Sequence, residues 1–140
     1  MIKNIFIALV NMILLVGCVD LPAETKNISA QVEGHEWKLV SFGENNMAVS
    51  GKATLLMKNG HYSGWSGCNS MSGTYLLKKD KLTFDTNSPH HSGISTMMAC
   101  ADMELETRYH ENMRKVNRYK IEDGHLILLD GDRPLLMFRR

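Results

Sequence analysis

Tight turns recur along the chain between short apolar segments, and they limit the folds that are open to it. Asn59-Gly60, Asp123-Gly124 and Asp130-Gly131 each separate two such segments, and the polar stretch Lys78–Lys81 does the same. Asn-Gly and Asp-Gly pairs accept the positive φ angles that two-residue hairpin turns require. The pattern predicts successive antiparallel hairpins that form a strongly curved sheet or an open barrel.

One segment has the periodicity of a helix instead. Leu105, Tyr109, Met113 and Val116 recur at helical spacing, and Asp102 stands where an N-cap is expected. Acidic residues gather in the first turn of this segment and basic residues near its end, an order that suits the helix dipole. The sequence therefore predicts an α+β fold, in which a curved, mostly antiparallel β-sheet or open barrel packs against one main α-helix.

The N-terminal stretch predicts export. Residues 1–17 resemble a signal peptide, because Lys3 is followed by an apolar run from Ile5 to Val16 that is too short to span a bilayer comfortably. The ending "LVGC" resembles the lipobox of bacterial lipoproteins, in which Cys18 becomes the acylated first residue of the mature chain. Several acyl chains would anchor a small domain durably, since each buried methylene contributes about 0.8 kcal/mol. The alternative is an ordinary signal peptide with a cysteine at the cut site by chance.

The rest of the chain divides into two regions. Residues 18–34 are polar and aperiodic, which predicts a lipidated N-terminus and a flexible tether ahead of one domain at 35–140. No acidic residue directly follows Cys18, and by resemblance to the best-known sorting rule this favours an outer-membrane lipoprotein facing the periplasm over the inner membrane or the cell surface. Removal of residues 1–17 leaves 15 of the 16 basic residues against 15 acidic ones. This balance argues against nucleic acid as a partner.

Several blocks of the domain resemble one known family, the META or HslJ-like domain. They are an opening Trp37-x-Leu39, "GCNSMSGTY" at 67–75, "STMMAC" at 95–100, the helical "ELETRY", and the closing "YKIEDGHLILL" and "LLMF". The resemblance covers nearly all of 35–138. It implies a small α+β domain of bacterial envelope proteins, often lipoproteins, with links to heat shock and to novobiocin resistance. It implies no established catalytic residue.

Two cysteines besides Cys18 are available for chemistry, Cys68 and Cys100. In an oxidising compartment they most simply pair, and the chain-entropy model gives such a disulfide about 3–4 kcal/mol of stabilisation. Two buried, reduced thiols that pack as small apolar residues are the alternative. A catalytic Cys68 would need a base within hydrogen-bond reach, and no peptidase motif surrounds it.

No metal-binding spacing occurs among the six histidines and the cysteines, because the chain has neither a His-x-x-x-His pair on a helix nor a Cys-x-x-Cys knuckle. His90-His91 are expected in a solvated loop. Met97-Met98 and the nearby Cys100 have the soft sulfur ligands that suggest a copper site. The two methionines are instead expected to fill gaps in the core. The sequence predicts no metal and no cofactor.

Two pairs of carboxylates stand close enough in the sequence to be compared with a catalytic acid–base couple. Glu104 and Glu106 are two positions apart on the predicted helix and point to different faces, and Asp130 and Asp132 belong to a turn. Neither pair resembles an acid–base couple, and all four side chains are expected to face solvent. No catalytic residue is predicted.

Together these features predict a non-enzymatic, lipid-anchored envelope protein with a stress-related or partner-binding role at the outer membrane. Its partners would be the membrane, through the lipid, and an envelope protein or a small ligand. A pilot-like lipoprotein that escorts an outer-membrane secretion component is one alternative, and it would need an apolar groove beside the helix. A thiol redox protein or hydrolase using Cys68 and Cys100 is the other, and it would need an exposed thiolate of low pKa beside a histidine.

Overall fold

The structure is a computed structural model that describes residues 23–43, 47–49, 52–85, 94–96, 98–101 and 103–140. The expected signal peptide at 1–17 and the lipidation site Cys18 lie outside these ranges. The elements in chain order are α1 (Ala23–Val32), β1 (Glu36–Phe42), β2 (Met47–Ala48), β3 (Thr54–Lys58), β4 (His61–Trp65), β5 (Ser70–Lys78), β6 (Lys81–Phe84), β7 (Ile94–Ser95), α2 (Met103–Met113), β8 (Arg118–Glu122), β9 (His125–Asp130) and β10 (Arg133–Arg139).

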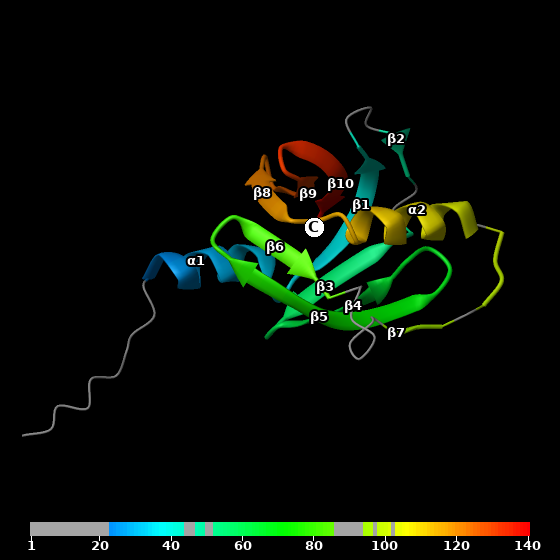
Figure 1. Cartoon of the computed structure of the whole chain (residues 1–140), viewed down its shortest axis with the longest axis horizontal. Coiled ribbons are helices and arrows are strands. Elements are labelled where there is room, and N and C mark those ends of the chain that lie inside the picture. Colours follow the sequence, from blue (N-terminus) through cyan, green and yellow to red (C-terminus); the bar gives the residue numbers. More distant parts are fainter. Residues whose placement is uncertain (1–22, 44–46, 50–51, 86–93, 97, 102) are drawn as a thin grey trace, which may run out of the picture.

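Eight of the strands form a closed antiparallel barrel in the order β1-β3-β4-β5-β6-β8-β9-β10 (Figure 1). The ring closes where β10 pairs with β1 and Leu39 lies opposite Phe138. The short strands β2 and β7 add to the outside of this ring, on β1 and β5. The expected antiparallel sheet with a main helix is confirmed, but the barrel is closed where the sequence allowed for an open one.

The hairpin turns lie where the sequence predicted them. Asn59-Gly60 joins β3 to β4 with φ angles of 52° and 78°, and Asp123-Gly124 joins β8 to β9 with φ angles of 49° and 76°. Lys79, with a φ of 55°, turns the chain between β5 and β6. In the first two of these turns both central residues have left-handed angles, which give the type of turn whose twist matches that of the strands on either side.

The interior of the barrel is a packed core. Each of the eight barrel strands contributes buried side chains, and the largest that are fully enclosed include Trp37, Leu55 and Phe138. Tyr109 and Met113 of α2 join this core, and the ring of Tyr109 meets that of Phe138 edge-on at 6.3 Å between centroids. An eight-stranded barrel is just wide enough for side chains to fill it. The barrel is therefore a solid support for α2.

Helix α2 agrees with the predicted periodicity, because Tyr109 and Met113 are buried and Leu105 packs against the core at the edge. Val116 is also buried, although the helix ends at Met113. The predicted N-cap, Asp102, lies outside the described residues.

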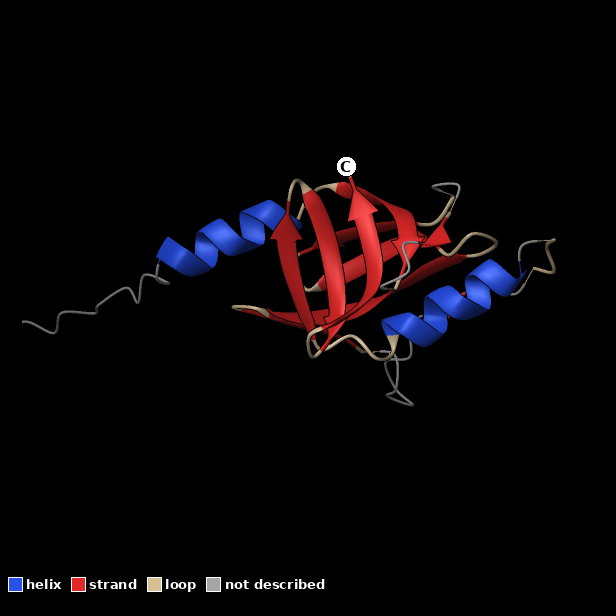
Figure 2. Ribbon diagram, turned by 90° about the horizontal axis from the view of Figure 1, so that it is seen from above, coloured by secondary structure: helices blue, strands red, loops and turns tan. Residues whose placement is uncertain are grey.

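Helix α1 was not predicted, because it lies within the polar stretch that was expected to be a flexible tether. Val32 is fully buried, and the indole Nε1 of Trp37 donates a 2.8 Å hydrogen bond to the Val32 carbonyl oxygen. The hydroxyl of Tyr75 donates to the carboxylate of Glu33, just after the helix. These contacts hold α1 on the opposite side of the barrel from α2 (Figures 1 and 2). Within the described ranges, neither helix is long and apolar enough to cross a membrane.

Candidate functional site

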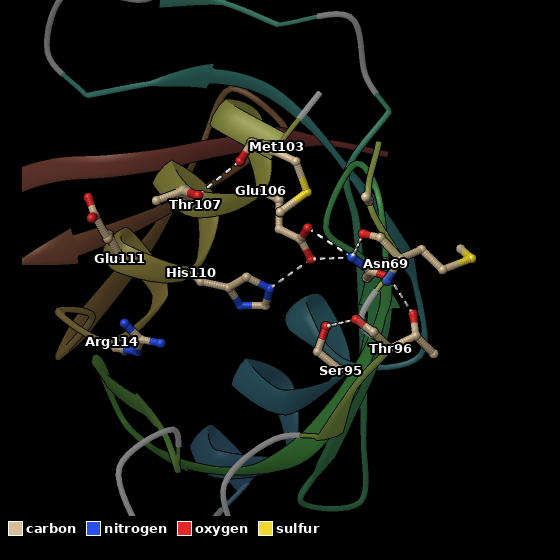
Figure 3. Close-up of a pocket in the computed structure, with 11 residues that line it drawn as sticks. Asn69, Ser95, Thr96, Met103, Glu106, Thr107, His110, Glu111 and Arg114 are labelled. Atoms are coloured by element: carbon tan, nitrogen blue, oxygen red, sulfur yellow. Dashed lines mark hydrogen bonds and ion pairs between the residues drawn. The ribbon is translucent and has the colours of Figure 1, made fainter. Parts of the chain in front are cut away.

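A cleft of about 530 Å³ lies between α2 and the segment 95–99, whose described residues are Ser95, Thr96, Met98 and Ala99 (Figure 3). Asn69, immediately before β5, contributes to the cleft from the barrel side. The α2 side chains that line it recur at spacings of three and four residues and so share one face of the helix. They are Met103, Glu106, Thr107, His110 and Glu111, and Arg114 follows directly after the helix on the same face. This volume lies in the range of small-ligand sites.

Glu106 is the buried acid of this cleft. Only 7% of its surface is exposed, and its carboxylate accepts a hydrogen bond of 2.9 Å from the Ser66 hydroxyl. The amide Nδ2 of Asn69 lies 3.0 Å from Oε1 and 2.9 Å from Oε2 of the same carboxylate. The prediction that Glu106 faces solvent is wrong, because two neutral donors from the barrel compensate the loss of water around the charge. Glu104 is exposed, as predicted.

Asn69 connects Glu106 to the opposite wall of the cleft. Its side chain is 98% buried, and its Oδ1 accepts hydrogen bonds of 2.8 Å from the Thr96 hydroxyl and 2.8 Å from the Met98 backbone N–H. Its Nδ2 also donates to the Met98 carbonyl oxygen at 3.2 Å. One amide side chain thus ties the segment 95–99 to α2, and the cleft lies between the two.

The loop that presents Ser66 and Asn69 needs small residues. Gly67 has a φ of +108°, and a Cβ added there would lie 2.6 Å from the side chain of Leu105 on α2. A residue with a side chain would therefore be strained and would push the helix away. The backbone N–H of Ser66 donates to the Asn69 carbonyl oxygen at 2.8 Å, which closes the turn. The glycine at 67 thus lets Ser66 and Asn69 reach the Glu106 carboxylate.

A disulfide joins Cys68 to Cys100, with their Cα atoms 5.8 Å apart. This is the pairing favoured over two reduced thiols. Cys68 is 99% buried, and its Sγ lies 3.2 Å from the Met98 carbonyl oxygen. The bond therefore fixes the wall of the cleft covalently, one residue from Asn69 at one end and three residues before α2 at the other.

His110 lies one helical turn after Glu106 and faces the same carboxylate (Figure 3). Its Nε2 is 3.5 Å from Oε1 of Glu106, and 28% of its side chain is exposed. The ring also meets that of Tyr109 edge-on at 6.0 Å between centroids. A protonated imidazole makes an ion pair with Glu106 at this distance.

Metal ligation finds little support in this arrangement. Within the part of the chain that the structure describes, no group of three His, Cys, Asp or Glu side chains is placed to hold a metal ion. His90-His91 and Met97 lie outside the described residues. Met98 lines the cleft with half of its surface exposed, so the prediction that it fills a gap in the core is wrong. What the cleft offers is a fixed acceptor carboxylate, an imidazole and apolar thioethers.

One signal in the sequence points to Glu106. It stands at i, i+3 and i+7 with Tyr109 and Met113, the two residues of α2 that enter the core, so the spacing places the acid on the buried face. Ser66 and Asn69 carry no such signal. They meet Glu106 across 40 and 37 residues of sequence, a distance that local patterns do not reach.

Comparison with known proteins places the chain in context. The model of the META domain family matches residues 30–140. A structure determined by NMR of a protein from Burkholderia xenovorans is similar, with a TM-score of 0.61 and 26% identity over 81% of this chain and 86% of that one. A crystal structure of a DUF4847 family protein from Bacteroides vulgatus shares the fold, with a TM-score of 0.59 and 12% identity over 80% and 96% of the two chains. A search of curated proteins found no match.

Proposed function

The chain belongs to the META domain family, and we propose that it is a lipid-anchored, non-enzymatic protein of the bacterial envelope that binds a partner in the cleft beside α2. The observation that carries this proposal is the buried Glu106 carboxylate, which neutral donors hold at the floor of an open cleft. A group held in this way is suited to recognition, because its position is fixed before any ligand arrives.

The support for an envelope location comes from the N-terminus and from the cysteines. Residues 1–17 have the composition of a signal peptide, and "LVGC" resembles a lipobox ending at Cys18. The Cys68–Cys100 disulfide fits the same compartment, because such bonds persist in the periplasm and are rare in the cytosol. An outer-membrane position facing the periplasm, and a role under stress, are further parts of the proposal.

The support for binding comes from the rigidity of the cleft walls. The disulfide and the hydrogen bonds of Asn69 fix the segment 95–99, and the packed barrel supports α2 from behind. A wall that moves little on binding loses little conformational entropy, which favours affinity. The cleft is therefore the surface of the described domain on which we expect a partner.

The two alternatives find less support. A pilot-like escort would need a contiguous apolar groove, whereas the barrel interior is filled and the cleft carries Glu106, His110 and Arg114 among its lining. A thiol hydrolase would need a free thiolate, whereas both candidate sulfurs are in the disulfide. A redox protein would hold the same pair in its oxidised form, and it would need a thiolate of low pKa after reduction. The pH dependence of iodoacetamide labelling after reduction tests the second alternative, and the absence of an inflection at low pH would remove it.

Crosslinking in cells tests the binding proposal. A photoreactive residue at Thr107, which is exposed and lines the cleft, is compared with the same residue at Thr83, which is exposed on β6 and does not line it. We expect Thr107 to capture one partner in a fixed ratio and Thr83 not to. The capture should also be lost in Glu106→Gln. Equal capture at the two positions, or only abundant envelope proteins at both, would contradict the proposal.

Metabolic labelling tests the anchor separately. We expect the chain to incorporate an alkyne analogue of palmitate and to sediment with membranes, and Cys18→Ser to do neither. Cys18→Ser is a clean comparison because the residue precedes α1 in the sequence and lies outside the described ranges of the domain. Labelling of the Cys18→Ser variant would show that the lipid, if present, is attached elsewhere.

A further inference from the structure

The charge of Glu106 lacks a permanent counter-ion in the described structure. Its carboxylate contacts two neutral donors, Ser66 and Asn69, and the imidazole of His110. Among the described residues, no lysine or arginine lies within ion-pair distance of it. Hydrogen bonds from neutral donors offset part of the cost of keeping a buried carboxylate away from water, and a positive charge beside it offsets more. Because Glu106 lines the cleft, a ligand can supply that charge.

The geometry around the carboxylate also restricts the shape of the cation. The Nδ2 of Asn69 bonds to both Oε1 and Oε2, so it occupies the position between the two oxygens that a guanidinium fork would need. An ammonium group is compact and approaches one oxygen from any open direction. A carboxylate has about four acceptor positions, and the three hydrogen bonds from Ser66 and Asn69 leave room for one more.

The rim of the cleft suits an alkyl chain attached to such a group. Met98 and Met103 both line the cleft and are 52% and 44% exposed, which is unusual for apolar side chains of their size. Met103 stands three residues before Glu106 on the same face of α2, and Figure 3 shows both side chains among those that line the cleft. Flexible methionine side chains adapt to apolar ligands of different shapes. The carboxylate and the two methionines together therefore match a cation at the end of a short apolar chain.

We propose that the cleft binds a primary alkylammonium group, with the ammonium on Glu106 and the alkyl chain against Met98 and Met103. This inference rests on the proposed binding function and names the chemistry of the ligand. Two sources share that chemistry, the lysine side chain of a partner protein and a free aliphatic diamine. The volume of about 530 Å³ admits either one.

Titration of the full chain followed by NMR tests this proposal. The probes are 1,5-diaminopentane for the free diamine and N-acetyl-lysine methylamide for the lysine side chain, and choline is a cation without N–H donors. We expect at least one ammonium probe to shift the side-chain NH₂ of Asn69 and the backbone amide of His110 in a saturable manner, and choline to shift neither. Saturation by the lysine derivative alone identifies a protein partner, and saturation by the diamine alone identifies a free amine.

Three variants show whether the effect comes from Glu106. Glu106→Gln removes the charge and should weaken binding at least about tenfold. Glu104→Gln removes an exposed carboxylate from the same helix, outside the cleft, and should change nothing. His110→Lys places an ammonium of the protein itself beside Glu106 and should abolish binding of the probe. This last variant keeps the test valid if Glu106→Gln does not fold, because it leaves the Glu106 hydrogen bonds in place.

Several results would overturn the proposal. They are the absence of saturable shifts at the cleft with both ammonium probes, equal binding of choline, and unchanged binding in His110→Lys or in a folded Glu106→Gln. If the probes fail while the photoreactive residue at Thr107 still captures a partner, the ligand chemistry is wrong and the binding function stands. If both experiments fail, the cleft is not a binding site.

Discussion

A single amide nitrogen of Asn69 bridges both oxygens of the Glu106 carboxylate, at 3.0 Å and 2.9 Å. Asn69 belongs to the barrel and Glu106 to α2, and Asn69 also holds Thr96 and Met98 through its carbonyl oxygen. The amide therefore connects the start of β5 to two later parts of the chain, which are 27 to 37 residues away in the sequence.

Asn69→Ala should lower the free energy of unfolding by about 3 kcal/mol, because it removes the amide hydrogen bonds to the buried Glu106 carboxylate and leaves the Met98 backbone N–H without its Asn69 acceptor. Urea unfolding followed by circular dichroism measures the change. Ser70→Ala is the matched control, since the Ser70 side chain is exposed in the adjacent position. A loss below about 1 kcal/mol in Asn69→Ala would mean that water replaces the amide without cost.

The Cys68–Cys100 disulfide should contribute about 3–4 kcal/mol, because it closes a loop across 32 positions of sequence in the unfolded chain. The double variant Cys68→Ala/Cys100→Ala should unfold at a lower urea concentration, with its free energy of unfolding reduced by that amount. Reductant should destabilise the unaltered chain to the same level and leave the double variant unchanged. If reductant has no effect on the unaltered chain, the two cysteines are not paired in the protein.

Tyr109→Phe should stabilise the protein by about 1 kcal/mol. The Tyr109 hydroxyl is fully buried and has no hydrogen-bond partner among the described residues, so the core holds a polar group without compensation. Tyr75→Phe is the contrasting variant, because it removes the hydrogen bond to Glu33 and should destabilise the protein. Differential scanning calorimetry resolves the two signs. A lower Tm for Tyr109→Phe would show that its hydroxyl has a partner.

Stability should fall at alkaline pH. Burial raises the pKa of each of the four tyrosines, and that of Tyr109 lies well above its usual value of 10.0. For Tyr75 burial is the largest cause, and the hydrogen bond to Glu33 raises the pKa further. The folded chain therefore keeps these protons where the unfolded chain releases them, so their contribution is full below pH 10 and is lost as the pH rises above it.

Ultraviolet absorbance of tyrosinate and circular dichroism, recorded between about pH 8 and about pH 12, check this expectation. The tyrosines should ionise together, in the same pH range in which the secondary structure is lost. Ionisation of all four near pH 10 in a folded protein would show that the rings are open to solvent.

Local features of this fold were predictable from sequence, and contacts across the barrel were not. The Asn59-Gly60 and Asp123-Gly124 hairpins follow from the residues in the turns themselves, and the periodicity of Tyr109 and Met113 identifies α2. The closing pair between Leu39 and Phe138 depends on how many strands coil before the ends meet. No local pattern records that number.

The candidate site depended on the same kind of distant contact. An acidic residue on a helix is usually exposed, so Glu106 was expected to face solvent. Its burial requires Ser66 and Asn69, which lie in the loop before β5. Three strands, β5, β6 and β7, separate this loop from α2 in the sequence, although the loop and Glu106 are in contact in space. Helix α1 was missed for a related reason, since Trp37 and Tyr75 of the barrel hold it in place.

The pairing of β1 with β10 has a consequence for how the protein is made. The first barrel strand has no closing neighbour until the last one has been synthesised, so the ring cannot form gradually as the chain emerges. The ring therefore closes only after the final strand is available. Such a delay would suit the export that we propose for this chain, and loss of β10 would leave both β1 and β9 at an open edge.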